Sequence, residues 1–243
     1  MEAHHEYADG ETRFEAFVAG GSPDRRRPCV LIAHAWDGPN PILHELARDI
    51  ARQGRVGIVL DVYGIGNRGA IDGDNAHLMN PLLADRALLQ RRLLAAHAFA
   101  RSLSIVDPDR IASFGPCFGG LCALDLARAS PPGLVGAIAL HAPLVPPGGQ
   151  PSPIAARVLV LHGWEDPTAP PADVVALARE LTAAGADWEV HAFGHAMHAF
   201  SFAGANAPER GILYEPRAAA RARRLIATFL DEVLPVEISG PSR

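Results

Sequence analysis

Residues 115–120 read Gly-Pro-Cys-Phe-Gly-Gly and place a cysteine where an apolar run of strand type meets a run of helical type, with almost no loop between them. A sharp strand-to-helix turn strains the backbone, so it needs small neighbours, and Gly115 and Gly119 supply them. The turn also puts Cys117 at a helix N-terminus, where free N–H groups and the helix dipole favour a thiolate. The Gly-x-Cys-x-Gly-Gly spacing is typical of a nucleophile elbow and favours Cys117 as a nucleophile over a buried structural thiol.

A thiol nucleophile needs a general base, and the base needs an acid to orient it. In a fold built around an elbow, both partners come later in the chain, the acid before the histidine. Acidic and histidine side chains follow the last two strands that the sequence predicts: Glu165, Asp166, His195 and His198. The order Cys117, Asp166, His198 meets the requirement, although the residues alone leave Glu165 and His195 as competitors.

The remaining chain predicts the elements that must position these side chains. Apolar or alternating runs predict strands at 12–19, 28–34, 55–62, 110–115, 134–142, 157–163 and 187–193. Helical periodicity predicts helices at 41–54, 82–103, 118–129, 172–184 and 216–233. We expect the run 12–19 to be an edge strand, because it alternates. Buried strands that alternate with helices predict an α/β fold with a mostly parallel central sheet, helices on both faces, and chemistry at the carboxyl ends of the strands.

Length and composition are those of a globular protein. The chain has 243 residues, of which 49% are hydrophobic and 20% charged, enough for one large α/β domain or two small ones. The Pro/Gly-rich segment 143–153 is the best candidate boundary, but strands of one pattern flank it and make it an internal crossover. We therefore expect a single domain over residues 1–243. The net charge of −5 argues against a nucleic-acid partner, which favours a basic face.

The sequence shows no clear signal for secretion, for a membrane span or for disulfide bonds. The first residues are polar and acidic, so no signal peptide is visible, and no apolar run is long enough to span a bilayer. The three cysteines are an odd number without the spacing of a disulfide framework. We therefore expect a cytoplasmic protein with reduced thiols and no membrane partner.

Several segments, taken in order, resemble the dienelactone hydrolase family of the α/β-hydrolase superfamily. VDPDRIASFGPCFGG resembles the family's elbow, LVLHGWEDP its acid loop and HAF its histidine loop, while LDVYGIGNRG resembles a tyrosine-containing segment common in the family. The resemblance extends from Tyr7 to about Leu234. It implies a single-domain α/β-hydrolase fold and a hydrolase that cleaves a carboxylic ester or lactone without a cofactor, and it favours Asp166 over Glu165 as the acid.

The resemblance also assigns roles to single residues. Cys117 matches the family's nucleophile, Asp166 its acid, and His198, which Ala-Phe follows, its general base. The oxyanion hole of such a fold uses the N–H of the residue after the nucleophile and an N–H from the loop after an early strand. By position these are Phe118 and Trp36.

Two positions depart from the family's pattern. Characterised members carry a glutamate near the resting thiol where this chain has Ala35, and a substrate-holding arginine where it has Phe202. Arg68 and Arg86 are the other candidates for a cationic contact with substrate, although arginine is more often a surface residue. The resemblance therefore assigns the catalytic residues of this chain but does not assign its substrate.

A metal site is the first alternative to this interpretation, because His191, His195 and His198 lie close together in the sequence. They lack the spacing of a known metal motif, and strand alternation sends their side chains in different directions, so we expect no metal and take His195 as a polar loop residue. Cys29 and Cys122 fall inside a predicted strand and a predicted helix, which indicates core positions.

The second alternative belongs to another class of function: a binding or thiol-sensing protein on a catalytically silent hydrolase scaffold. The complete set of cysteine, aspartate and histidine argues against it. We expect a small-molecule ester or lactone as the partner, and a monomer or a homodimer.

Overall fold

A computed structural model describes residues 1–71, 73–149 and 152–236. One eight-stranded sheet runs through it in the order β1-β2-β4-β3-β5-β6-β7-β8. The strands are β1 (Glu2–Asp9), β2 (Thr12–Ala19), β3 (Arg27–Ala33), β4 (Val56–Leu60), β5 (Val106–Pro116), β6 (Leu134–Leu140), β7 (Arg157–Gly163) and β8 (Trp188–Phe193). The six from β4 to β8 in the sheet are parallel, while β1 and β2 are antiparallel to their neighbours.

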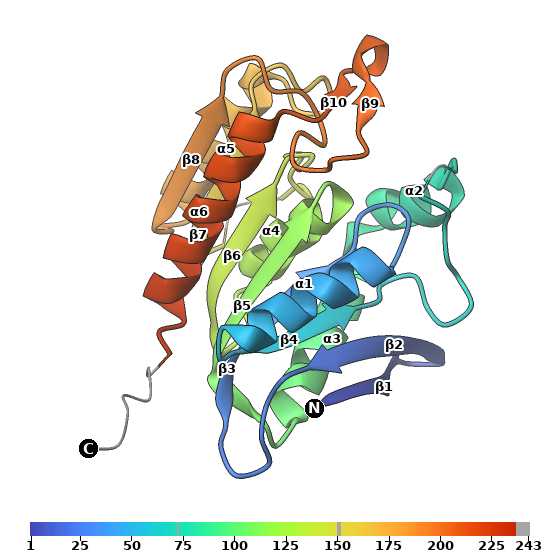
Figure 1. Ribbon diagram of the computed structural model, residues 1–243. Helices are drawn as coiled ribbons and strands as arrows, with labels where there is room; N and C mark the ends of the chain where they lie inside the picture. Colours follow the sequence, from blue (N-terminus) through green and yellow to red (C-terminus); the bar gives the residue numbers. More distant parts are fainter. Residues whose placement is uncertain (72, 150–151, 237–243) are drawn as a thin grey trace.

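Helices cover both faces of this sheet (Figure 1). They are α1 (Pro41–Arg52), α2 (Ala76–Ala84), α3 (Arg86–Ser102), α4 (Phe118–Ala129), α5 (Pro171–Ala183) and α6 (Pro216–Val233). A short 3-10 helix, η1 (Pro208–Arg210), separates β9 (Asn206–Ala207) from β10 (Ile212–Leu213) in a second, two-stranded sheet. In Figure 1 the carboxyl ends of β5 and β6 point toward the end of the molecule that carries α2, β9 and β10.

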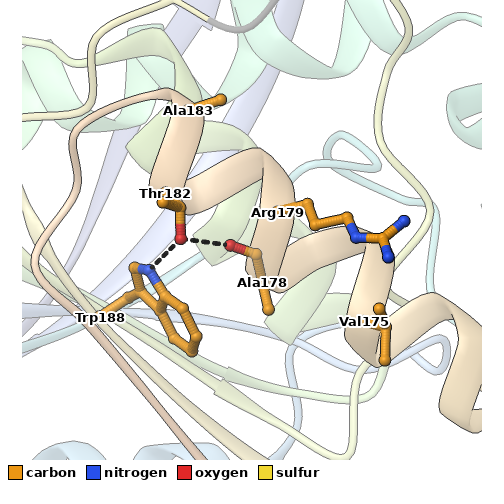
Figure 2. Close-up of a pocket in the computed structure, with 6 residues that line it drawn as sticks. All are labelled: Val175, Ala178, Arg179, Thr182, Ala183 and Trp188. Atoms are coloured by element: carbon orange, nitrogen blue, oxygen red, sulfur yellow. Dashed lines mark hydrogen bonds between the residues drawn. The ribbon is translucent and has the colours of Figure 1, made fainter.

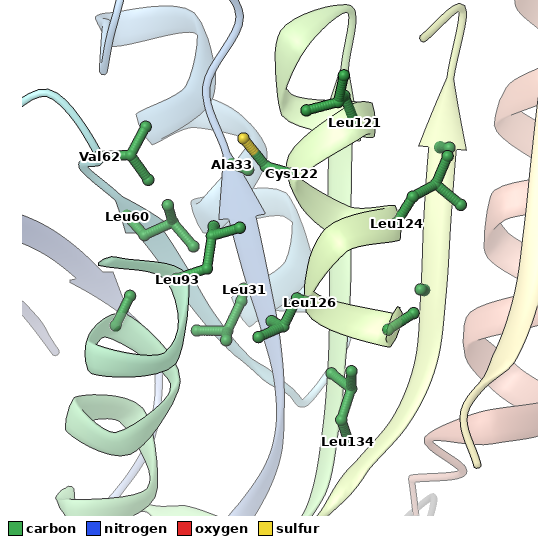
Figure 3. Packing of buried hydrophobic residues seen from close by; sticks show 14 of the residues in the cluster. Leu31, Ala33, Leu60, Val62, Leu93, Leu121, Cys122, Leu124, Leu126 and Leu134 are labelled. Carbon is green, nitrogen blue, oxygen red and sulfur yellow. The ribbon is translucent and has the colours of Figure 1, made fainter. Parts of the chain in front are cut away.

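Two hydrophobic clusters, one on each face, hold the helices to the sheet. Alternate residues of β3 show the division, because Leu31 belongs to one cluster and Ile32 to the other. The first cluster gathers side chains of α3, α4 and α5, and Figure 3 shows part of it around Leu93 and Leu121. The second gathers side chains of α1 and α6, such as Ile50. The central strands are apolar throughout because both of their faces are covered.

The mostly parallel sheet with helices on both faces confirms the predicted fold class, but the prediction of an edge strand at 12–19 was wrong. β1 lies outside β2 and pairs with it along its whole length. Apart from Tyr7, the side chains of β1 stay at least partly exposed, so its polar sequence carries no burial signal. Tyr7 is buried, and its ring stacks on Phe14 and Phe99.

The helix predicted at 82–103 is two helices. The chain breaks at Asp85, whose side chain accepts a hydrogen bond of 2.8 Å from the N–H of Leu88 and so caps α3. The preceding helix, α2, begins at Ala76, earlier than the apolar periodicity indicated. No helix in the described part of the chain is long and apolar enough to cross a membrane. The extent of the domain over residues 1–243 stays a prediction.

Candidate active site

Cys117 lies at the sharp turn between β5 and α4. Its backbone has φ 53° and ψ −122°, a conformation that is strained for any residue with a side chain. The Cys117 N–H donates a hydrogen bond of 2.9 Å to the carbonyl of Leu140 at the end of β6, which ties the turn to the neighbouring strand. The thiol is partly exposed, whereas Cys29 and Cys122 are fully buried. The turn therefore presents one cysteine of the three to solvent.

Close backbone approach explains the glycines around this turn. A Cβ on Gly115 would lie 2.2 Å from the carbonyl of Gly119, and a Cβ on Gly119 would lie 2.3 Å from the carbonyl oxygen of Ala33. Real Cβ atoms do not come so close to backbone, so any larger residue would push α4 away from β5 or β3. The glycines thus let α4 begin directly against the end of β3.

His198 contacts the thiol from the loop that follows β8. Its Nε2 lies 3.2 Å from Sγ of Cys117, and its ring is almost completely buried. The backbone of His198 is held by β10, since its N–H donates to Gly211 and its carbonyl accepts from Leu213. Burial alone would lower the pKa of His198, but its contacts with Asp166 and Cys117 outweigh burial and raise the pKa to about 10. The geometry therefore favours a protonated imidazole beside the sulfur.

Asp166, in the turn after β7, lies on the other side of the ring. Its Oδ2 is 2.8 Å from Nδ1 of His198. Its Oδ1 accepts hydrogen bonds from the N–H and the hydroxyl of Thr168, at 2.8 and 2.6 Å. Burial would raise the pKa of Asp166, but these hydrogen bonds and the nearby His198 lower it below its ordinary value. The carboxylate thus stays charged and holds the Nδ1–H tautomer of the histidine.

Thr168 is one residue of this site that the sequence interpretation missed. Its Oγ1 also lies 3.1 Å from Nδ1 of His198, so it contacts both partners of the pair. The signal was present in the sequence: an aspartate followed two residues later by threonine is typical of a turn in which the carboxylate accepts from backbone and hydroxyl.

The two competitors in the sequence form a separate pair on the surface. Nδ1 of His195 lies 2.8 Å from Oε1 of Glu165, and the His195 side chain is 95% exposed. His191 contacts Glu189 on β8 instead. The three histidines of this segment therefore point to three different partners. Among the described residues, no three His, Cys, Asp or Glu side chains are grouped closely enough to hold a metal ion.

The two predicted oxyanion donors lie on adjoining elements. Phe118 is the first residue of α4, and the first N–H groups of a helix have no intrahelical acceptor. Trp36 follows β3, and its carbonyl accepts a hydrogen bond of 3.0 Å from the hydroxyl of Tyr63. The Tyr63 ring stacks on that of Phe118, with 5.9 Å between centroids. Tyr63 thus contacts both residues.

The arginine candidates have protein partners. Arg86 holds the buried Asp125 through two hydrogen bonds of 2.6 and 2.8 Å and donates a third to the carbonyl of Val145. Its guanidinium is therefore committed to joining α3, α4 and the loop after β6. Arg68 donates to Asp61, but its side chain is one-third exposed. Of the two, Arg68 retains more access to solvent.

The remaining predicted positions carry no charge. Ala35 is half-buried directly after His34, and Phe202 is exposed in the loop that also holds His198. His141 adds a buried ring 5.4 Å from that of His198, and its Nε2 lies 2.8 Å from the hydroxyl of Ser201. Burial and the charge on His198 lower the pKa of His141 to about 3, so this second ring stays neutral.

A shallow depression lies apart from these residues, between α5 and β8 (Figure 2). Val175, Ala178, Arg179 and Thr182 of α5 line one side of it, and Trp188 of β8, whose indole N–H donates to Thr182, lines the other. Arg179 is the one ionisable group among its lining residues. We therefore place no chemistry there.

A nucleophile elbow on a mostly parallel sheet, with an acid after β7 and a histidine after β8, defines an α/β hydrolase. Comparison with known proteins narrows the class. The sequence profile of the dienelactone hydrolase family matches residues 14–234, so the chain belongs to the dienelactone hydrolase family. This confirms the resemblance and makes the chain a hydrolase of the carboxylic ester and lactone class.

Three similar proteins illustrate the relationship. A dienelactone hydrolase-like promiscuous phosphotriesterase from metagenomic libraries has 27% identity and a TM-score of 0.87, with 96% of this chain and 98% of that chain covered. The structure named m3DLH has 32% identity and a TM-score of 0.84 over the same shares of the two chains. The Yersinia pestis protein that bears the name Putative carboxymethylenebutenolidase is 29% identical over 202 residues, 76% of this chain and 73% of its own.

Proposed function

We propose that this chain hydrolyses a carboxylic ester or a lactone through a triad of Cys117, His198 and Asp166 and a thioester intermediate. One observation carries the proposal: a continuous line of contacts runs from the sulfur through Nε2 and Nδ1 of the imidazole to the carboxylate, at 3.2 and 2.8 Å. This is the geometry in which a base controls the proton of a nucleophile and an acid orients the base.

In the acylation step, the Cys117 sulfur forms a bond to the carbonyl carbon of the substrate, and the π electron pair moves to the carbonyl oxygen. The N–H groups of Phe118 and Trp36 stabilise that oxyanion, each by about 3 kcal/mol when preorganised. His198 then gives its Nε2 proton to the leaving oxygen as the C–O bond breaks. In a lactone that oxygen stays on the acyl chain, so the thioester carries the new hydroxyl.

In the deacylation step, the neutral His198 takes a proton from water while the water oxygen attacks the thioester carbon. The second tetrahedral intermediate collapses, the C–S bond breaks, and the carboxylic acid leaves. The thiolate and the imidazolium are then restored. Asp166 keeps the same tautomer throughout and stabilises the imidazolium charge.

We infer that the substrate is neutral or weakly polar. Exposed apolar side chains occupy the segments that follow four strands, after β4, β6, β7 and β8: Ile65, Ile71, Val145, Trp164 and Phe202. Arg86, one candidate partner for a substrate carboxylate, is committed to Asp125. A carboxylate without a paired cation costs several kcal/mol in a dry site. This end of the sheet thus favours apolar acyl or alcohol groups.

The test is an activity screen on lactones and short-chain esters, with Cys117→Ala as the control. We expect hydrolysis by the unsubstituted chain, none above background by the variant, and an acyl adduct on Cys117 in the intact mass after rapid quenching. Full activity in Cys117→Ala would exclude the thiol mechanism. Labelling of the thiol without turnover of any substrate would favour a silent binding or thiol-sensing protein instead.

A second candidate activity is hydrolysis of phosphotriesters, which the similar phosphotriesterase favours. A phosphotriester is neutral, as is the substrate class inferred above, and its phosphoryl oxygen would accept from the same N–H groups. An aryl dialkyl phosphate in the same screen tests it. Turnover that Cys117→Ala abolishes would support this activity, and turnover that the variant retains would assign it elsewhere.

A reducing, cytoplasmic location suits this proposal. All three cysteines are free thiols, and a thiol nucleophile works only in its reduced form. Oxidation of Cys117 to a sulfenic acid would stop turnover, and a thiol reductant would restore it.

A further inference from the structure

His34 is a fully buried histidine that the mechanism above does not use. It directly follows β3, and its side chain lies next to Tyr63 and Phe118, at 4.5 and 6.1 Å between ring centroids. Its carbonyl oxygen lies 2.8 Å from where a Cβ on Gly119 would be. His34 is therefore packed between the start of α4 and the segment that leads to Trp36.

Hydrogen bonds fix the tautomer of this ring. The N–H of Val62 lies 3.2 Å from Nε2 of His34, and a backbone N–H can only donate, so Nε2 is the unprotonated nitrogen. Nδ1 then carries the proton and donates it to the carbonyl oxygen of Ala35, 2.6 Å away. Burial lowers the pKa of His34 below its ordinary value, although the hydrogen bond to Ala35 and the nearby Asp61 oppose this effect. The ring stays neutral, with both nitrogens satisfied.

The acceptor of this hydrogen bond belongs to a peptide group with a second role. The Ala35 carbonyl and the Trp36 N–H are the two ends of one planar peptide, so a donor that fixes the carbonyl also fixes the direction of the N–H. The N–H of Gly38 donates to the same carbonyl at 3.2 Å. Hydrogen bonds in series polarise one another, so donors on the carbonyl make the Trp36 N–H a stronger donor.

We propose that His34 is a positioning residue of the oxyanion hole: its Nδ1–H orients and polarises the Ala35–Trp36 peptide, whose N–H stabilises the tetrahedral oxyanion. The inference rests on the proposed function, because it concerns the donor that Trp36 contributes there. The hydroxyl of Tyr63 also holds Trp36, because it donates a hydrogen bond to the carbonyl of that residue. His34 itself touches neither substrate nor the reacting sulfur.

Two substitutions separate the hydrogen bond from packing. Counted in bonds, the amide nitrogen of asparagine reaches as far as Nδ1, so His34→Asn keeps a donor for Ala35. The longer side chain of His34→Gln reaches only the position of Nε2, so it can accept from Val62 but offers the Ala35 carbonyl no donor in place of Nδ1–H, and the Gly38 N–H remains as donor to that carbonyl. We expect His34→Gln to lower kcat by roughly tenfold to a hundredfold with little change in KM. For His34→Asn we expect a decrease in log kcat that is less than about a third of the decrease in His34→Gln.

A substrate-independent readout distinguishes this proposal from the proposed function. Hexyl trifluoromethyl ketone accepts the Cys117 sulfur at its carbonyl carbon, and the electron pair of the C=O bond stays on the oxygen as an oxyanion. Alkylation of Cys117 by iodoacetamide forms no oxyanion. We expect His34→Gln to weaken ketone binding by the same factor as kcat and to leave the alkylation rate within about twofold of the unsubstituted chain, with His34→Asn intermediate.

Equal ketone binding by the unsubstituted chain and His34→Gln would overturn the proposal, whether or not an ester substrate has been found. Parallel losses of ketone binding and alkylation in both variants would also overturn it, because His34→Asn keeps the donor to Ala35, and equal losses would mean that His34 acts through packing. Nitrogen NMR of the unsubstituted chain provides a test that needs no variant. A protonated Nδ1 and an unprotonated Nε2 on His34 from about pH 6 to 9 support the proposal, and the opposite tautomer contradicts it.

Discussion

The Nε2 atom of His198 lies 3.2 Å from the sulfur of Cys117, although 81 residues separate the two in the sequence. The contact forms because β5 and β8 end at the same edge of a parallel sheet, so the residues that follow the two strands come together. Local backbone preference explains the position of neither residue, because Cys117 has a strained backbone and His198 is held by hydrogen bonds to Gly211 and to Leu213 of β10. The fold thus maintains an arrangement that only the chemistry requires.

The thiols should differ in reactivity. With limiting iodoacetamide near neutral pH, we expect Cys117 to be labelled well before Cys29 or Cys122, because burial raises the pKa of both buried thiols and also blocks access to them. Peptide mass mapping over time gives the three rates, and denatured protein is the control in which they converge. Equal labelling in the native state would contradict the activated thiol.

The two histidines of the loop should also differ. We expect His198→Ala to reduce kcat by several orders of magnitude, because it removes the proposed general base. We expect His195→Ala to retain most activity, because His195 is exposed and contacts only Glu165 among the catalytic candidates. Steady-state kinetics of both variants, with circular dichroism to confirm folding, measure this. Comparable losses would leave the base unassigned, and loss of activity in EDTA would support a metal instead.

Stability should depend on pH through His198 and Asp166. The pKa of His198 is raised from 6.5 to about 10, so the free energy of unfolding it contributes is fully present below pH 6.5 and is lost as the pH rises toward 10. The pKa of Asp166 is lowered from 3.8, so its contribution is present above that pH and lost below it.

The unsubstituted chain should therefore exceed His198→Ala in stability most clearly between pH 4 and 6.5, and the difference should shrink by pH 10. Urea unfolding of both proteins at a series of pH values measures it. A difference that grows with pH would contradict the assigned charge state.

The elements that carry the site follow from local sequence. The helices predicted at about 118–129 and about 216–233 correspond to α4 and α6, because glycine spacing marks the start of the first and a proline the start of the second. Strand β7 is equally well defined as an apolar run between polar turns. β1 escaped prediction because an exposed edge strand needs no apolar pattern, and its pairing with β2 is a property of the tertiary structure.

The triad residues of the site could be predicted because they lie in recurring sequence motifs, whereas contacts between residues far apart in the sequence could not. The order of Cys117, Asp166 and His198 came from the sequence, and the structure brings them together. The commitment of Arg86 to Asp125 could not be foreseen, since 39 residues separate the two and each side chain alone reads as solvent-facing. The bond from His34 to Ala35 was equally hidden, because it depends on the tautomer that Val62 imposes.

A buried arginine outside the candidate site should contribute strongly to stability by binding the C-terminal end of α6. Arg55 is 1% exposed and donates to the carbonyls of Leu230 and Leu234 at the end of this helix, as well as to Asp231. We expect Arg55→Met to lower the free energy of unfolding by about 3 kcal/mol, because it removes the donor of the buried Leu234 carbonyl and one of two donors to the Leu230 carbonyl, which also accepts from the N–H of Leu234.

Asp231→Asn is the matched control. The Asp231 side chain is 70% exposed, so its ion pair with Arg55 should contribute at most about 1 kcal/mol. Chemical unfolding of the three proteins gives the comparison. Equal losses in both variants would mean that the ion pair, and not the capping of α6, holds the helix.

The last prediction concerns substrate charge. Phe202 is 38% exposed, and the sequence resemblance places it where the family is expected to hold a substrate carboxylate with arginine. Arg86 is committed to Asp125, which leaves Arg68 as the remaining candidate cation of the two. We expect kcat/KM to be higher for a neutral lactone than for the same lactone with a free carboxylate, because the unpaired charge loses its hydration on binding.

Phe202→Arg should shift that preference toward the carboxylate, and Val175→Arg, at an exposed apolar position on α5 where no chemistry is placed, is the control for net charge alone. Measuring kcat/KM for the matched lactones on all three proteins decides the matter. If the unsubstituted chain favours the carboxylate by about tenfold, or about 1.4 kcal/mol, the apolar assignment of the substrate fails. Loss of that preference in Arg68→Met would then identify Arg68 as the anchor, since its guanidinium would have exchanged Asp61 for the substrate.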